Sequence, residues 1–347
     1  MNLKELSAKL GLSQTTVSRA LNDYPEVGEA TRRRVKEAAD AHNYFPNSRA
    51  RRLATGRSMT IGHVIPVSNQ HEMVNPIFTD FIAGAGEAYS EAGYDLTLSL
   101  VSDDDLDKVY RDLARRGSVD GFVIHGPKIG DPRVGLLKDI GIPFVVHGRV
   151  SAADQTYSWL DVNNRRAFFR AANFLLDLNH RRIGLINGLE EMDFSIRRRD
   201  GYLNALTERS IPHAPDYMAH GEMTEPYGYL SAKRMLELDR PPTAFLISSI
   251  ISAFGARRAI AETGLVVGKD VSIIVFDDDL SYFRNDNAEP VYTAVKSSVR
   301  TAGREAGNML LDIIRGTREA PLHKLLEAEL TVGQSTGPAP ASPSYSG

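Results

Sequence analysis

The chain of 347 residues contains no cysteine, a single tryptophan and no run of 18 consecutive apolar residues. The absence of cysteine excludes a disulfide framework and thiolate chemistry. Without a long apolar run a transmembrane helix is not expected, and the N-terminus lacks the apolar segment of a signal peptide. We therefore expect a cytoplasmic protein without a membrane partner.

Motifs of common metal and cofactor sites are also missing. The sequence has no His-Glu-x-x-His and no P-loop pattern. Residues 84–89 lack the third glycine of a dinucleotide fingerprint and start inside a helical pattern. The aspartates at 103–105 lack the spacing and the glycine of a calcium loop, and favour a helix start instead. We expect no catalytic residue, no metal and no cofactor.

The first residues show the pattern of two short helices joined by a tight turn. Asn2 and Glu5 have the spacing of a capping box, and leucines at positions 3, 6 and 10 recur at helical spacing. Gly11 is expected to end this helix, because glycine adopts the left-handed conformation readily. Ser13 is a suitable N-cap for a second helix that begins at Gln14. The segment has the pattern of a helix-turn-helix.

The second helix has one apolar and one polar face. The inward side carries Val17, Ala20 and Leu21, and the outer side carries Gln14, Thr15, Ser18 and Arg19. In the major groove of DNA, glutamine can pair with adenine and arginine with guanine. This face therefore predicts sequence-specific DNA binding; the alternative is an ordinary solvated helical hairpin.

A third helix is predicted over residues 27–43, with a basic face that is either solvated or near DNA phosphates. Four motifs follow one another in the order Thr16-Val-Ser-Arg-Ala-Leu-Asn22, Thr31-Arg-Arg-Arg-Val35, Asn43-Tyr-Phe-Pro-Asn47 and Ala50-x-x-Leu-Ala54. This order resembles the LacI/GalR family of bacterial transcriptional regulators, strongly over residues 1–58 and more loosely to about residue 335. The resemblance implies a ligand-responsive regulator of transcription.

Charge is distributed unevenly along the chain. Residues 1–57 hold 11 Lys and Arg against 6 Asp and Glu, a balance of +5, whereas the whole chain has a net charge of −3. Residues 58–347 therefore carry a net charge of −8. A basic head on an acidic body concentrates the attraction for phosphate at one end of the molecule.

Residues 47–58 are expected to form a hinge. Asn47 can cap a short helix through Ala54, and an isolated helix of this length is marginal in water. The family resemblance implies that two such helices pair in a homodimer and insert Leu53 into the minor groove. The alternative is a plain tether with Leu53 packed on the body. The full set of expected DNA-binding residues is Ser13, Gln14, Thr15, Ser18, Arg19, Asn22, Asn47, Arg51, Leu53 and Ala54.

From residue 59 onward, apolar strand patterns alternate with helical ones, which predicts parallel α/β sheets covered by helices. About 270 residues are long for one such sheet, so we expect two lobes. A ligand is expected in a cleft at the carboxyl ends of the strands, as in the periplasmic-binding-protein-like fold that the family carries. The expected domains are a helix-turn-helix domain at 1–46, a hinge at 47–58, a two-lobed core at 59–333 and a disordered tail at 334–347.

Three effector-binding residues are implied by family motifs. Arg198 precedes Gly201 at the family's effector arginine, and a guanidinium suits hydroxyls or a carboxylate. Asp277 matches an acidic position that binds sugar hydroxyls through strong charged hydrogen bonds. Phe78 matches an aromatic residue that stacks on a ring, although a core aromatic fits its pattern nearly as well. Arg197 and Arg199 are alternatives to Arg198.

Other positions depart from the family pattern. Ser248-Ser249 and Asn163-Asn164 stand where the family often has Asn-Asp and Asp-Asn, and Met223 stands where some members have an aromatic residue. The two missing carboxylates put a standard monosaccharide geometry in doubt. Replacement hydrogen-bonding groups are expected at strand ends, from His125, His147 and Arg149. The combinations His147-Gly-Arg149 and Asp277-Asp-Asp-Leu-Ser-Tyr282 resemble those of regulators of α-glucoside uptake.

The sequence therefore predicts a ligand-responsive, sequence-specific DNA-binding regulator, a homodimer that represses genes of carbohydrate uptake or catabolism. Its expected partners are operator DNA and a small-molecule effector, a sugar by resemblance, and its place is the bacterial nucleoid. Two alternatives are a solute-binding protein of a transporter and a regulator that responds to a non-sugar metabolite. The absent signal peptide and the DNA-binding head argue against the transporter component.

Overall fold

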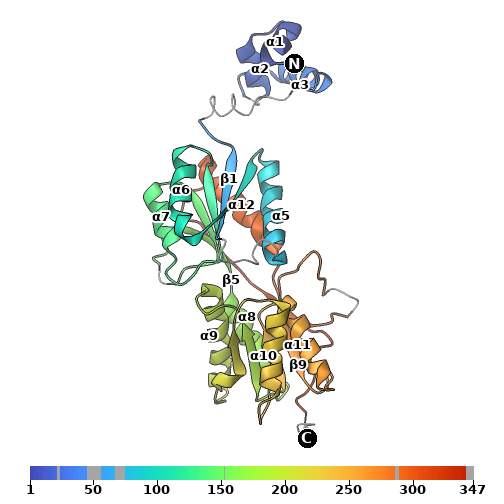
Figure 1. Ribbon diagram of the computed structural model, residues 1–347. Helices are drawn as coiled ribbons and strands as arrows, with labels where there is room; N and C mark the ends of the chain where they lie inside the picture. Colours follow the sequence, from blue (N-terminus) through green and yellow to red (C-terminus); the bar gives the residue numbers. More distant parts are fainter. Residues whose placement is uncertain (22–23, 45–55, 67–74, 152, 286–288, 341–347) are drawn as a thin grey trace. The chain divides into compact units, whose positions relative to one another are not determined.

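The computed structural model describes residues 1–21, 24–44, 56–66, 75–151, 153–285 and 289–340 (Figure 1). The chain divides into two compact units, Met1–Met59 and Thr60–Gly347. In the described part of the chain, no helix combines the length and the apolar character needed to cross a membrane.

The first unit is a bundle of three helices, α1 (Leu3–Leu10), α2 (Gln14–Leu21) and α3 (Glu29–Ala41). The capping box forms as predicted, since the Asn2 side chain accepts from the amide of Glu5 and the Glu5 carboxylate accepts from the amide of Asn2. Gly11 ends α1 with a φ of +64°. A small core fixes the helices to one another and consists of Leu6, Val17, Ala20, Val27, Val35 and Ala39. This packing leaves the polar face of α2 toward solvent.

The second unit contains two six-stranded sheets, each the centre of a lobe. The first lobe has the all-parallel strand order β11-β5-β4-β3-β1-β2. Its strands are β1 (Thr60–Pro66), β2 (Asp95–Val101), β3 (Gly121–His125), β4 (Phe144–His147), β5 (Ser158–Val162) and β11 (His323–Leu326). Its helices are α5 (Pro76–Glu91), α6 (Leu106–Arg115), α7 (Pro132–Ile140) and α12 (Val299–Arg315), and the 3-10 helix η2 (Asp103–Asp105) precedes α6.

The second lobe has the strand order β12-β10-β9-β8-β6-β7, in which only the edge strand β12 is antiparallel to its neighbour. Its strands are β6 (Ile183–Asn187), β7 (Met218–His220), β8 (Ala244–Ile247), β9 (Ser272–Asp277), β10 (Thr293–Lys296) and β12 (Glu329–Thr331). Its helices are α8 (Asn164–Asp177), α9 (Asp193–Glu208), α10 (Glu225–Leu236) and α11 (Ile250–Glu262), with the 3-10 helix η3 (Pro215–Tyr217) before β7. The chain crosses between lobes after β5, β10 and β11, so both lobes are built from distant segments.

Glycine lets the helices pack at very short separations in both lobes. A Cβ on Gly84 of α5 would lie 1.9 Å from the carbonyl oxygen of Arg300 in α12, and α12 lies beside α5 (Figure 1). The same holds for Gly201 of α9 against α8, and for Gly228 of α10 against α11. These pairs hold the helices that begin at the edge of the cavity described below.

The prediction that residues 334–347 form a disordered tail is wrong for those of them that the structure describes. Ser335 is buried, and its hydroxyl donates to the carbonyl of Ile273 and accepts from the amide of Thr293. Further along, the amide of Gly337 donates to the hydroxyl of Ser272. Small and polar residues suggested disorder, but here they bond to β9 and β10 of the second sheet; residues 341–347 lie outside the described residues.

Candidate functional site

A cavity of about 380 Å³ lies between the two lobes of the second unit. It opens where strands of both sheets end, because β3, β4 and β5 of the first lobe and β9 of the second lobe contribute residues at or next to their carboxyl ends. The wall is mixed, with aromatic and methionine side chains around a few polar groups, as in sites for small molecules. The lining residues used below are Phe78, Phe81, His125, His147, Asp161, Asn164, Arg198, Glu222, Met223, Glu225, Phe276 and Asp278.

Arg198 of α9 lines the cavity and is held in place from three sides. Its Nε donates to Oδ1 of Asn164 over 2.8 Å, and its Nη1 donates to the carbonyl oxygen of Ser248 over 2.7 Å. The guanidinium lies 3.9 Å from the ring centroid of Phe276. Burial lowers the pKa of Arg198 to about 10, so the group stays charged at neutral pH. Ser248 itself does not line the cavity, and its hydroxyl donates to Asn187.

The acidic residue at the cavity is Asp278 rather than Asp277. The side chain of Asp277 is buried away from the cavity lining, and its Oδ1 accepts from the amide of Asp279. Asp278 follows directly after β9, so its side chain points to the other side of the chain and lines the cavity. Burial raises the pKa of Asp278 to about 7, against the charge of Arg198, which lowers it.

Asn163 and Arg149 also lie outside the cavity wall. Asn163 caps α8 by accepting from the amide of Arg166, and its amide group donates to Glu327. The neighbouring Asn164 takes the place at the cavity. Arg149 acts at one remove, since its Nε donates over 2.7 Å to Asp161, which lines the cavity.

Four other expected effector residues do line the cavity: Phe78, His125, His147 and Met223. His125 and His147 end the adjacent parallel strands β3 and β4 and are paired in register. The ring of His147 stacks on that of Phe81 with their centroids 4.3 Å apart, and the ring of Phe78 meets that of His125 edge-on with centroids 5.1 Å apart. Burial lowers the pKa of His147 to about 4 and that of His125 well below its ordinary value, so both rings are uncharged at neutral pH.

The sequence motifs did not indicate several wall residues, chiefly Phe81, Asp161, Asn164, Phe276 and Asp278. Asn164 and Asp278 each stand one residue beyond a predicted contact. Asp161 and Phe276 belong to strands whose carboxyl ends meet the cavity, which was the available signal for them.

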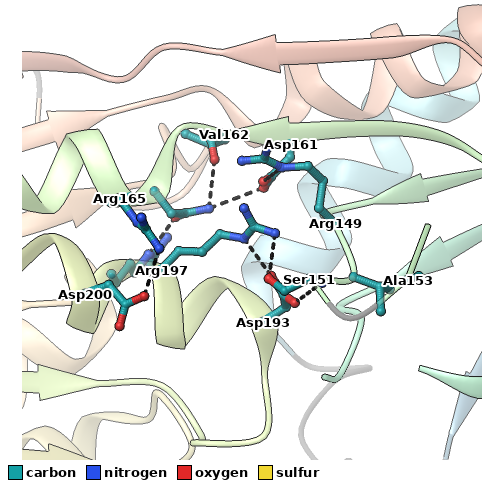
Figure 2. A network of polar contacts seen from close by, with 12 residues as sticks. Arg149, Ser151, Ala153, Asp161, Val162, Arg165, Asp193, Arg197 and Asp200 are labelled. Carbon is teal, nitrogen blue, oxygen red and sulfur yellow. Dashed lines mark hydrogen bonds and ion pairs between the residues drawn. The ribbon is translucent and has the colours of Figure 1, made fainter. Parts of the chain in front are cut away.

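Two aspartate–serine pairs join the lobes. Asp193, at the start of α9, accepts from the amide of Ser151 at 2.6 Å and from its hydroxyl at 3.0 Å. Arg197 donates to both residues, as Figure 2 shows. Asp80 of α5 accepts in the same way from the amide and the hydroxyl of Ser281, each at 2.7 Å. Since each pair links one lobe to the other, we call them the two interlobe clasps.

The expected DNA-reading residues of the first unit lie on or beside α2. Gln14, Thr15 and Arg19 are exposed, and Ser18 is half-buried. Ser13 caps the helix, because its hydroxyl accepts from the amide of Thr16 at 3.0 Å. Asn22, Asn47, Arg51, Leu53 and Ala54 lie outside the described residues.

The C-terminal segment contains one catalytic sequence pattern. Residues Gly333-Gln-Ser-Thr-Gly337 match the Gly-x-Ser-x-Gly pattern of hydrolase nucleophiles. That pattern needs a strand-to-helix turn with an exposed hydroxyl, whereas Ser335 is buried against β9 and β10 with its hydroxyl bonded on both sides. The serine serves the fold here. The described residues also contain no cluster of three metal-ligating side chains.

Comparison with known proteins places both units. Residues 2–47 match the model for bacterial regulatory proteins of the lacI family, and residues 172–336 match that for a periplasmic binding protein-like domain. The chain is 43% identical to the HTH-type transcriptional regulator AglR of Rhizobium meliloti (strain 1021), over 98% of this chain and 95% of AglR. It is 31% identical to the HTH-type transcriptional repressor CytR of Escherichia coli (strain K12), over 97% of each chain.

Solved structures give the same picture. A complex of the transcriptional regulator CelR with cellobiose superposes with a TM-score of 0.70 at 27% identity, covering 96% of this chain and 99% of CelR. The lac repressor dimer bound to operator and an anti-inducer shares the fold, with a TM-score of 0.78 at 23% identity over 97% and 99% of the two chains.

Proposed function

Because the chain belongs to the LacI family of bacterial transcriptional regulators, we propose that it represses genes for uptake or breakdown of a small carbohydrate and that an uncharged sugar in the interlobe cavity releases it from DNA. The family is one of DNA-binding regulators and not of enzymes. The observation that carries the proposal is the cavity wall, in which a fixed arginine and an acid face aromatic surfaces.

The wall suits a polyol that carries no charge. Sugar hydroxyls both donate and accept, and Arg198, Asn164 and Asp278 offer both kinds of partner. Phe276 and Phe78 offer flat apolar faces for the C–H surface of a sugar ring. The lining holds one arginine and four carboxyl groups, those of Asp161, Glu222, Glu225 and Asp278. Both histidines are uncharged. This balance disfavours sugar phosphates and uronates.

A disaccharide is the first candidate for the effector. The motifs around His147 and Asp277 resemble those of regulators of α-glucoside uptake, and CelR is a relative solved with a disaccharide. The aromatic walls would also stack a planar ring, so a non-sugar metabolite such as a nucleoside is the competing effector class. A solute-binding role is disfavoured by the three-helix unit with its exposed polar face on α2.

On the DNA side, we propose that Gln14, Thr15, Ser18 and Arg19 read bases in the major groove, with Ser13 and Asn22 at the ends of that helix. A homodimer would place two such helices on the halves of a pseudo-palindromic operator in the nucleoid of a bacterial cytoplasm. The hinge residues Asn47, Arg51, Leu53 and Ala54 keep the minor-groove role that the family resemblance implies.

A thermal-shift panel tests the effector class, because a ligand that binds the folded state raises its stability by mass action. The panel holds glucose, maltose, trehalose, sucrose, cellobiose, glucose 6-phosphate, glucuronate and cytidine. We expect one or more uncharged sugars to raise the melting temperature and the anionic sugars to leave it unchanged. A shift with cytidine alone would move the effector class to nucleosides, and a shift with the phosphate would contradict the charge argument.

A further inference from the structure

Behind the cavity wall of the first lobe lies a buried series of hydrogen-bonded polar groups, of which only the last one lines the cavity. Nε2 of His63, on β1, lies 3.1 Å from the hydroxyl of Tyr89, on α5. Nδ1 of His63 lies 2.7 Å from Nε2 of His125, the cavity residue at the end of β3. Tyr89 and His63 are 1% and 0% exposed, so the series is shielded from water up to His125.

In this series of hydrogen bonds, the imidazoles of His63 and His125 carry one N–H each. Burial lowers the pKa of His63 to about 3 and that of His125 well below its ordinary value, so both rings are neutral at neutral pH. Burial also raises the pKa of Tyr89, which therefore keeps its proton. A neutral imidazole is a donor at one nitrogen and an acceptor at the other, so the protons along the series must all point one way.

The hydroxyl at the closed end selects the direction. Among the described residues, the hydroxyl of Tyr89 has His63 as its hydrogen-bond partner and no other. If Nε2 of His63 donated to it, the buried hydroxyl proton would have no acceptor, which carries a desolvation penalty. Tyr89 therefore donates to Nε2 of His63. It follows that His63 donates from Nδ1 to Nε2 of His125, and that the proton of His125 sits on Nδ1.

We propose that Tyr89 and His63 are positioning residues that fix His125 as the Nδ1–H tautomer, so that His125 presents a hydrogen-bond donor to the effector. Nδ1 of His125 has no hydrogen-bond partner among the described residues and is not among their fully buried unpartnered nitrogens, and His125 lines the cavity. Phe78 and Phe81 meet the ring edge-on at 5.1 and 4.8 Å and hold its orientation.

This tautomer defines a specificity rule for the first-lobe end of the cavity, and the rule rests on the proposed effector function. An acceptor oxygen of a sugar, from a hydroxyl or a bridging position, can bond to His125, whereas an ammonium group cannot. The preference is set by a residue that the effector never touches, because Tyr89 lies two hydrogen bonds away from the cavity.

Two-bond ¹H–¹⁵N NMR of the full chain, without any ligand, tests the tautomer directly, since it separates Nδ1–H, Nε2–H and charged imidazoles. A His125→Gln variant assigns the His125 signals among the nine histidines. We expect uncharged Nδ1–H forms for both His63 and His125 at neutral pH. A His125 that is charged or in the Nε2–H form would overturn the proposal, whether or not any sugar binds.

Tyr89→Phe tests the origin of the preference, and Tyr202→Phe is its matched control. Tyr202 lies in the second lobe and is equally buried, and its hydroxyl donates to the carbonyl of Ile183 in the same lobe. Each variant therefore loses one buried tyrosine hydrogen bond. We expect Tyr89→Phe alone to bring a visible share of the Nε2–H form of His125. An unchanged His125 spectrum in Tyr89→Phe would show that the hydroxyl does not set the tautomer.

Calorimetry with maltose and cellobiose extends the test to binding. If half of the molecules carry the wrong tautomer, the apparent Kd rises about two-fold, and it rises about ten-fold if nine in ten do. We expect this loss in Tyr89→Phe but not in Tyr202→Phe, and no further loss from Tyr89→Phe in a His125→Phe background. If Tyr89→Phe weakened sugar binding equally in the wild-type and His125→Phe backgrounds, its effect would not pass through His125, which would contradict the proposal. If neither sugar binds the wild type, the sugar panel fails, while the NMR result still decides the tautomer.

Discussion

Asp278 is an acidic residue buried in the cavity wall. It is buried beside Asp277, and the opposing charge of Arg198 does not compensate fully, so its pKa lies near 7. A carboxyl with a pKa raised by folding binds its proton more tightly in the folded state than in the unfolded state. The contribution of this carboxyl to folding stability is then fully present below its ordinary pKa of 3.8 and is lost as the pH rises through about 7.

Asp278→Asn mimics the protonated acid, so the stability of the variant relative to the wild type should increase between about pH 4 and about pH 7. The wild type loses about 1.4 kcal/mol for each unit by which the pKa is raised, equivalent to about 2 °C or more in melting temperature. Melting curves across this pH range measure the difference.

Asp279→Asn is the control, because it removes a partly exposed carboxylate from the same loop, where Asp279 pairs with Lys296 at 2.8 Å. The control should retain the wild-type slope. A slope that Asp278→Asn leaves unchanged would show that this carboxyl is ionised in the folded protein throughout the range.

From the sequence, Arg198, Phe78 and both histidines were predicted at positions that line the cavity, whereas two other wall residues were missed by one position. The motif located the end of β9 and the start of α8, yet chose Asp277 over Asp278 and Asn163 over Asn164. At the end of β9 successive side chains point to opposite faces, so a shift of one residue turns Asp277 away from the cavity. At α8 the predicted Asn163 is the N-cap, and the next residue, Asn164, lines the cavity. Which residue ends the strand depends on the packing of both lobes, and no local pattern encodes that.

At the scale of elements, the close helix pair α5–α12 depends on the absence of a side chain at Gly84. Gly84→Ala should destabilise the first lobe by about 1–3 kcal/mol, because its Cβ would collide with the backbone of Arg300 and the helices must separate. Denaturant unfolding measures the change.

Gly86→Ala provides the matched control on the same helix. A Cβ at Gly86 meets nothing within 4 Å, so this variant should be stabilised by about 0.5–1 kcal/mol through helix propensity. If both variants were stabilised alike, close packing at Gly84 would not limit the helix pair.

The exposed face of α2 leads to a prediction for DNA. Arg19→Ala should weaken binding to the preferred operator by about 1–3 kcal/mol and relax its sequence preference, since a base contact is lost. Lys36→Ala on α3 is the comparison variant, because Lys36 is a basic residue outside the recognition helix. Fluorescence anisotropy on operator and on random DNA separates the two, and an equal loss on both DNAs for Arg19→Ala would exclude it as a base reader.

Elements with strong periodicity could be predicted from sequence, and short ones could not. The first two helices were predicted from capping residues and apolar spacing, the third from its helical pattern, and the alternation of strands and helices after residue 59 from its apolar runs. The edge strands β7, β11 and β12 have three or four residues each, with half-exposed patterns that resemble loops. Their placement comes from pairing with distant segments, as for Ser335 in the tail.

For the whole molecule, the interlobe clasps are hydrogen bonds that join the two lobes beyond the cavity wall itself. Ser151→Ala deletes the hydroxyl that bonds to Asp193 and Arg197, each bond contributing about 1 kcal/mol. If the sugar binds the clasped arrangement, this variant should bind it about five-fold more weakly or worse. Thr207→Ala, which removes an exposed hydroxyl bonded within its own helix, should leave the affinity unchanged. Calorimetry with both variants decides, and wild-type affinity in Ser151→Ala would exclude the clasp from effector binding.

Coupling between the cavity and DNA can be measured as operator binding with and without sugar. Wild type and Arg198→Ala are titrated onto a fluorescent operator, in the absence and presence of the disaccharide that stabilises the wild type. Because Arg198 lies in the cavity and not in the DNA-binding unit, both proteins should bind the operator equally well without sugar. We predict that the sugar releases the wild type and leaves Arg198→Ala bound. Release of both proteins, or of neither, would contradict it.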